Sequence, residues 1–433
     1  MILDKAQTNL ITVTALLFFC LVSFYLISVF GFTVDHKILV QGMCIGLIVC
    51  FLVVFQKKLF KPYLFIPFVS LAYGFMGGIN FIKRGSHVDF NNELYFMLFV
   101  FFIMLTYTVL SLATVVTKRK LNFKSVFTEK ASYFMLGTIV LLGLLSVLID
   151  WMQIGGVPLF SGSGARKGSK PLFRLIYIIA IFLAYYKVVL KPTRSNKMLL
   201  GLFVVCAILS AYRTSIVFIL IILFFNVAKT DFFRRNLKKI LILFALLFFC
   251  INLLKLHRDV TEYGIDHYYE IMDKEELPRK YLLLSPIIHT IREGPQIFQQ
   301  IRENLNGDYG KGKYFLEHIS TFLPGKQRNY GYIYNNIVKA PTDNTKTGTI
   351  IAPFYIDFGI IGICFLGVIL GYLNYTFDLK ARYSIYAHML YMYIVSFEIT
   401  WIHGGAPFSP TFLLALVFFM FSWPFVGLIK REL

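Results

Sequence analysis

Apolar runs of about 20 residues recur along the whole chain, and this is the length that crosses the hydrocarbon core of a bilayer as a helix. Short polar segments separate the runs. Hydrophobic residues make up 57% of the chain and charged residues 15%, whereas a soluble domain carries about 25% charged residues. The pattern predicts an all-α, polytopic integral membrane protein. The first run, residues 10–32, is too long for a cleaved signal peptide.

We expect about twelve transmembrane helices, which form a single transmembrane domain over residues 1–433. The expected spans cover residues 10–32, 38–55, 63–82, 93–116, 132–150, 172–190, 197–212, 214–228, 239–256, 349–373, 381–401 and 409–429.

Basic residues concentrate in one alternating set of loops, of which residues 118–120 and 234–239 are examples. This whole set of loops holds about half of the 43 Lys and Arg. Short basic loops face the cytoplasm, so we expect both termini there. The formal net charge of +20 is then mainly an orientation signal. Nucleic acid is not an expected partner, whereas the lipid bilayer is.

One loop on the opposite face is long and should form an ordered extracytoplasmic cap, inserted between the ninth and tenth spans at residues 257–347. It carries 12 Lys or Arg and 12 Asp or Glu, so it is neutral overall. Apolar residues recur in it at helical spacing. We expect helices around residues 287–291, 297–305 and 315–322, with breaks at Gly294-Pro295 and at Pro324-Gly325.

Arg213 lies in the middle of the apolar stretch 199–228. That stretch is longer than one crossing needs and has basic loops at both ends. Two short helices that meet near Arg213 explain both features, and they place the guanidinium in a recess open to the outside. A buried arginine there favours an anionic ligand. The alternative is a snorkelling arginine, or one neutralised by an aspartate for packing.

Further cations lie on the outer side, where the general bias disfavours them. The loop GGVPLFSGSGARKGSKPLFR contains Arg166, Lys170 and Arg174 among glycines and serines. Backbone N–H groups and guanidinium forks in such a loop can wrap a phosphate. A solvated basic loop is the plainer interpretation.

Tyrosines accompany another cation near the end of the long loop. Arg328 precedes Tyr330 and Tyr332, and His318 lies on the expected helix upstream. Aromatic rings among polar groups suit sugar rings, which stack on them through their C–H faces. The same tyrosines also fit a belt at the membrane interface, and the sequence leaves both interpretations open.

Few residues are candidates for acid–base chemistry. Asp357 lies in the tenth span, Glu398 lies in the outer part of the eleventh, and His403 follows in a short outer loop. An intramembrane carboxylate is a functional candidate by default. For Asp357 the alternative is a salt bridge with Arg213 or Arg174, and a lone loop histidine is often structural.

No cofactor or metal is expected. The eight histidines show no metal-binding spacing, and the six cysteines all fall inside apolar runs as small hydrophobic residues. Glycines at 359, 362, 367 and 371 in the tenth span favour close helix packing rather than catalysis.

The order of these parts resembles that of the Wzy-type polymerases of O-antigen and capsule repeat units. The motifs are GGVPLFSGSGAR in an outer loop, the helix pair around YRTS, YGKGKYFLEHISTFLP in the large loop, and TGTIIAPFYIDFGIIG at the start of a late span. The resemblance covers roughly residues 130–405, and no single motif in it is highly specific.

The resemblance implies a GT-C-type glycosyltransferase in the cytoplasmic membrane, with its active site facing outward. Its substrates would be oligosaccharides on undecaprenyl diphosphate, and a flippase and a chain-length regulator would be partners. Arginines would neutralise the departing diphosphate, and a carboxylate or histidine would activate the acceptor hydroxyl. The alternatives are a lipid-linked oligosaccharide flippase, an O-antigen ligase, and a sensor or assembly protein without catalysis. The long outer loop and the absence of an internal repeat disfavour the flippase.

Overall fold

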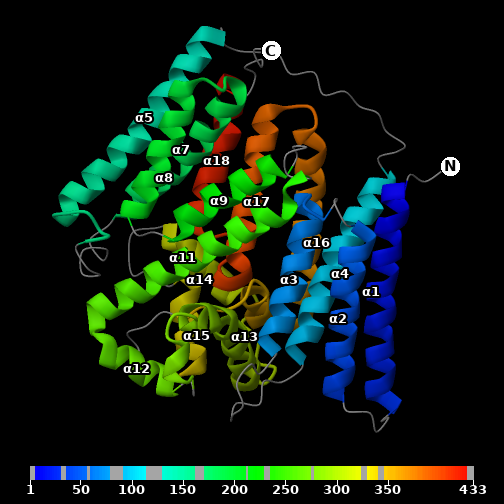
Figure 1. Cartoon of the computed structure of the whole chain (residues 1–433). Helices are drawn as coiled ribbons and strands as arrows, with labels where there is room; N and C mark the ends of the chain where they lie inside the picture. Colours follow the sequence, from blue (N-terminus) through cyan, green and yellow to red (C-terminus); the bar gives the residue numbers. More distant parts are fainter. Residues whose placement is uncertain are drawn as a thin grey trace. The chain divides into compact units, whose positions relative to one another are not determined.

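The computed structural model describes residues 5–30, 36–55, 59–78, 91–113, 129–160, 170–210, 213–228, 235–274, 277–322, 329–339 and 346–426. Over these residues the secondary structure is helical, with no strand (Figure 1). Each of the expected spans overlaps one of the observed helices. These are α1 (Lys5–Phe30), α2 (His36–Phe55), α3 (Pro62–Gly78), α4 (Asn91–Ala113), α5 (Glu129–Ile154), α7 (Pro171–Leu190), α8 (Arg194–Leu209), α9 (Arg213–Val227), α11 (Leu237–Tyr263), α16 (Ala352–Ala381), α17 (Ile385–Gly404) and α18 (Pro410–Val426).

Apolar helices long enough to cross a membrane confirm a multi-pass membrane protein. By length and composition, 5 of the described helices qualify, and they lie in α4, α5, α7, α11 and α16. Shorter apolar helices lie in α1, α2, α3, α9 and α18. Twelve crossings and the cytoplasmic placement of both termini stay predictions.

The chain divides into two compact units. Unit 1 comprises Met1–Lys120, His289–Thr376 and Glu398–Pro410, and unit 2 comprises Leu121–Ile288, Phe377–Phe397 and Thr411–Leu433. Four of the boundaries fall inside α13, α16, α17 and α18, and the one at Lys120 lies outside the described residues, so the chain passes between the units several times. Each unit therefore assembles segments that are distant in the sequence.

In unit 1, the helices α1 to α4 pack side by side, and α16 packs on α4 (Figure 1). The contact between α4 and α16 depends on two glycines. A Cβ on Gly367 would lie 2.9 Å from the carbonyl oxygen of Phe99, and one on Gly371 would lie 2.7 Å from that of Ile103. Glycine at these positions thus allows the two backbones to approach closely, as the sequence predicted.

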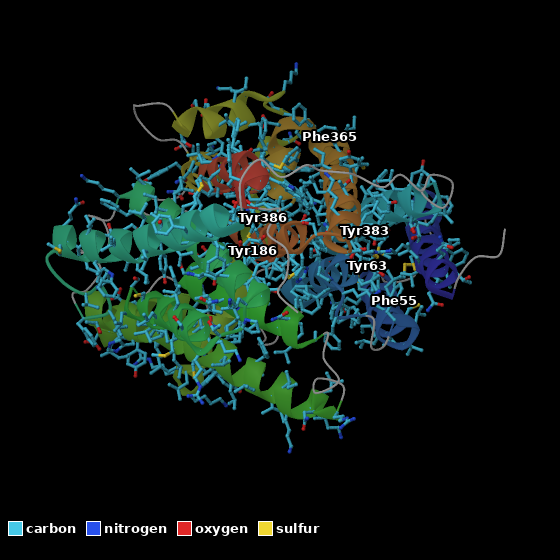
Figure 2. The ribbon with its side chains drawn as sticks, turned by 90° about the horizontal axis from the view of Figure 1, so that it is seen from above. Phe55, Tyr63, Tyr186, Phe365, Tyr383 and Tyr386 are labelled. Atoms are coloured by element: carbon cyan, nitrogen blue, oxygen red, sulfur yellow. The ribbon has the colours of Figure 1, made fainter. Side chains whose placement is uncertain are left out.

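In unit 2, α7 packs along α5 and α8 and is buried over most of its length. Aromatic side chains fill its core. The rings of Tyr186 and Tyr386 meet edge to face with their centroids 5.3 Å apart (Figure 2). Their hydroxyl groups bond to the carbonyl oxygen of Val426 and to the side chain of Ser422. The buried hydroxyls are thereby satisfied, which burial in an apolar core requires.

The long loop is helical, as predicted. Beyond the end of α11 it forms α12 (Ile265–Lys274), the short η3 (Arg279–Tyr281), α13 (Ser285–Leu305), α14 (Lys313–Ile319), η4 (Ser320–Phe322) and α15 (Tyr330–Val338). Pro324 and Gly325 lie outside the described residues.

The predicted break at Gly294-Pro295 is wrong, because α13 continues through both residues. Proline removes one backbone donor and usually ends or kinks a helix. Here α3 and α4 support the helix at this point. The Asn92 side chain donates to the Pro295 carbonyl at 3.0 Å, and the Tyr73 hydroxyl donates to the Thr290 carbonyl at 3.3 Å. These tertiary hydrogen bonds therefore hold α13 in place at the proline and before it.

Candidate functional site

His403 is half-buried near the end of α17 and lies against Tyr73 of α3. The Tyr73 hydroxyl oxygen is 3.2 Å from His403 Nδ1. The two rings meet edge to face, with centroids 6.3 Å apart. Unit 1 therefore provides the predicted histidine with a hydrogen-bonded partner.

A second histidine, on α13, is paired with a carboxylate. On α13, His289 Nε2 is 3.4 Å from Glu293 Oε2, and both side chains are partly accessible. Glu293 also acts electrostatically on Tyr73. These four side chains, Tyr73, His289, Glu293 and His403, are hereafter called the α3–α13–α17 cluster. The cluster combines a carboxylate, two imidazoles and a phenol, which are the groups that proteins use to move protons.

Asp357 caps α14 rather than forming a described ion pair. Its Oδ1 accepts from the backbone N–H groups of Gly312 and Tyr314 at 3.0 and 3.1 Å, and its Oδ2 accepts from Phe315 at 2.8 Å. A carboxylate at a helix N-terminus satisfies donors that have no partner within the helix. Two residues later, Gly359 adopts a φ of 61° and kinks α16. Asp357 thus anchors the loop helix α14 to the beginning of α16.

His318 and Tyr330 are buried against each other between α14 and α15. Their ring centroids are 4.2 Å apart, and Tyr330 stacks in turn on Tyr334 at 5.8 Å. Among the described residues, neither His318 nitrogen has a hydrogen-bond partner, nor does the Tyr330 hydroxyl. Burial lowers the pKa of His318 to about 4, so its imidazole is neutral at neutral pH. Tyr332, by contrast, is 44% exposed.

Tyr334 connects this stack to the loop after α17. Its hydroxyl donates to the Gly405 carbonyl at 2.6 Å. A Cβ on Gly405 would lie 2.5 Å from the carbonyl carbon of Gly348, so these two backbones touch. Asp357, His318 and Tyr330 therefore belong to one packed region with the end of α17, which carries His403.

Glu398 lies deeper on α17 and is fully buried. Asn374 Nδ2 on α16 donates to both carboxylate oxygens, at 3.0 and 2.9 Å. This contact joins α16 to α17.

The predicted cations belong mostly to unit 2. Lys170 is exposed at the start of α7, where its backbone N–H donates to Asp150 Oδ1 at 3.3 Å. Arg174 lies in the first turn of α7 and is half-buried. Arg213 begins α9, four residues after α8 ends, so the long apolar stretch does divide into two short helices as predicted. The Arg213 side chain, Arg166 and Arg328 lie outside the described residues.

Comparison with known protein families identifies the family of this chain. The family model "Putative O-antigen polymerase" matches residues 58–414, which is most of the sequence. The chain belongs to the O-antigen polymerase family. No curated protein and no solved structure matches it. As a member of this family, the chain is a membrane protein of polysaccharide biosynthesis, and the match confirms the resemblance that its sequence motifs indicated.

Sequence reasoning missed Tyr73, His289 and Glu293. The spacing of His289 and Glu293, four residues apart on a helix, was a signal available in the sequence. Tyr73 gave none, because it lies among apolar residues of a span and meets His403 across 330 residues of chain. Among the described residues, no three His, Cys, Asp or Glu side chains gather as metal ligands would.

Proposed function

We propose that the chain is a glycosyltransferase that polymerises oligosaccharide repeat units on undecaprenyl diphosphate at the outer face of the cytoplasmic membrane. The observation that carries this proposal is the family match over residues 58–414. The α3–α13–α17 cluster supports it, because glycosyl transfer to a hydroxyl needs a proton acceptor.

The leaving group sets the first chemical requirement. Transfer of the growing glycan breaks its bond to the lipid diphosphate, so negative charge develops on the departing phosphate oxygen. Fixed guanidinium and ammonium groups stabilise that charge. Arg213, Arg166, Arg174, Lys170 and Arg328 are the cations that we propose for this role, with Arg213 first because it lies at the junction of two short apolar helices.

The acceptor hydroxyl sets the second requirement. We propose His403 as its general base, ahead of Glu398 and Asp357. Glu398 is fully buried and holds Asn374, and Asp357 accepts three backbone N–H groups, so each already has a structural role. His403 is half-buried, and the hydrogen bond described above joins it to Tyr73 rather than to a structural partner on α16 or α14.

The residues proposed to contact the glycan are chosen by the accessibility of their side chains. Tyr332 presents an accessible ring on α15 and is the proposed stacking surface for a sugar. Tyr330 and His318 are buried behind it, and we propose that they contribute to glycan binding by shaping the α14–α15 surface.

The experiment that tests the function uses purified protein with lipid-diphosphate repeat units, analysed on a gel. A ladder of products supports a polymerase. Transfer only to a lipid A-type acceptor would instead indicate a ligase, and unchanged chain length would reject both activities.

The Arg213→Ala variant tests the leaving-group role. We expect loss of the ladder with normal membrane insertion, because a removed transition-state cation costs about 100-fold or more in rate. Arg382→Ala is the matched control, since Arg382 is an exposed arginine paired with Asp378 in unit 2. A normal ladder from Arg213→Ala would refute the role.

A further inference from the structure

We infer that Tyr73 is a positioning residue that holds the His403 ring with its proton on Nδ1, so that Nε2 is the basic nitrogen. This inference rests on the proposed glycosyl transfer. It adds a residue from α3, outside every motif that suggested the function.

The hydrogen-bond geometry determines the tautomer. The Tyr73 phenol has a single hydrogen, and its oxygen lies 3.3 Å from the Thr290 carbonyl and 3.2 Å from His403 Nδ1. A carbonyl oxygen can only accept, so the phenol donates to Thr290. The phenol oxygen then accepts from Nδ1–H of His403. If the proton were on Nε2 instead, two lone pairs would face each other across the contact.

The phenol is fixed in place by its packing. Its ring meets Phe96 of α4 edge to face, with centroids 6.1 Å apart. A Cβ on Gly294 would lie only 2.5 Å from the phenol oxygen, so α13 can approach Tyr73 only because residue 294 is glycine. The phenol oxygen therefore has little freedom to leave His403, and the histidine ring has a fixed orientation.

The charged neighbours favour the same arrangement. His403 contacts Tyr73 of α3, and the neighbouring α13 carries the paired His289 and Glu293, of which Glu293 acts electrostatically on the phenol. An anion beside the phenol favours an imidazolium on His403 when Nε2 takes up a proton.

The glycosyl group moves from the diphosphate oxygen of the donor to the hydroxyl oxygen of the acceptor. The acceptor hydroxyl loses its proton to Nε2 while its oxygen forms the bond to the anomeric carbon of the donor. The bond from that carbon to the diphosphate oxygen breaks, and the electron pair leaves with the diphosphate. The imidazolium then returns its proton to water.

The test compares three variants in the polymerisation assay across pH. Tyr73→Phe removes only the hydroxyl. We expect kcat to fall about tenfold with KM unchanged, and the acid limb of the kcat profile to move to lower pH because the imidazolium loses its acceptor. His403→Asn keeps an N–H donor near the Nδ1 position but has no basic nitrogen, so it should fold and be inactive. Tyr372→Phe, on an exposed tyrosine of α16, is the control and should match the wild type.

The outcomes separate this inference from the proposed function. An active wild type with an unshifted limb and normal kcat in Tyr73→Phe overturns the positioning role alone. Activity in His403→Asn overturns the base assignment. Absence of any ladder from the wild type rejects the function itself. If Tyr73→Phe does not fold, His403→Asn still tests the proposal, because activity in it overturns the inference and inactivity in a folded variant supports His403 as the base that Tyr73 would orient.

Discussion

His318 shows how a single buried residue couples the loop to pH. It stacks on Tyr330 and is 1% exposed, and neither of its nitrogens has a hydrogen-bond partner in the part of the chain that the structure describes. Its helical spacing in the sequence indicated a surface helix but not the partner on its other side. The same holds for Asp357. Its place in a span could be predicted from the sequence, but the three backbone N–H groups at the start of α14 that donate to it could not. Burial depth follows from local pattern, whereas pairing depends on long-range packing.

We predict that acid destabilises the protein through His318. Its pKa is about 4 in the folded protein because burial disfavours the charged form, against an ordinary value of 6.5. Between these values the unfolded chain binds a proton that the folded protein does not, so stability falls as pH drops from about 6.5 to about 4, by up to about 3 kcal/mol. Thermal unfolding in detergent across this range measures the loss.

The His318→Phe variant keeps a ring against Tyr330 but cannot titrate, so its midpoint should change less with pH. His257→Gln is the control, because His257 is exposed on α11 and its loss should leave the pH dependence intact. Equal pH dependence in wild type and His318→Phe would contradict the assignment.

At the scale of elements, hydropathy predicted the helices well because each long apolar run must satisfy its own backbone in lipid. Every expected span contains a helix, and the division near Arg213 is confirmed. The error at Gly294-Pro295 has a clear cause. The local sequence shows that proline lacks an N–H donor. It does not show that the side chain of Asn92, on α4, donates to the proline carbonyl.

The pair of helices α4 and α16 gives an element-scale prediction. Gly367→Ala should destabilise the protein by about 1–3 kcal/mol, because the new methyl group would meet the Phe99 carbonyl oxygen and the Phe102 side chain at under 3 Å. Gly201→Ala on α8 is the matched control. A Cβ there meets nothing within 4 Å, so helix propensity alone acts and should stabilise by about 0.5–1 kcal/mol. Denaturation in detergent compares the two, and equal effects would refute close packing at Gly367.

At the scale of the whole molecule, the membrane class and the family could be predicted from the sequence, and His403 could be named as a candidate, but the residues around it could not. Tyr73 and Thr290, which are 217 residues apart, meet in unit 1. Such a contact has no local signal, because neither a phenol in an apolar run nor a loop threonine is unusual. The cations were recognisable for the opposite reason. A charge on the disfavoured side of a membrane is anomalous by itself.

The orientation of the chain is the last prediction. Basic loops keep to the cytoplasm, so the segment between α7 and α8 should lie inside and the loop with α14 outside. Leu316 on α14 is 67% exposed and Pro192 between α7 and α8 is exposed as well. A membrane-impermeant maleimide should therefore label Leu316→Cys in intact cells or spheroplasts, and should label Pro192→Cys only after permeabilisation. The wild type gives the background from its native cysteines. The reverse pattern would place α14 in the cytoplasm, where the loop could not meet a glycan presented on the outer face, and the proposed polymerase would then lose its active site.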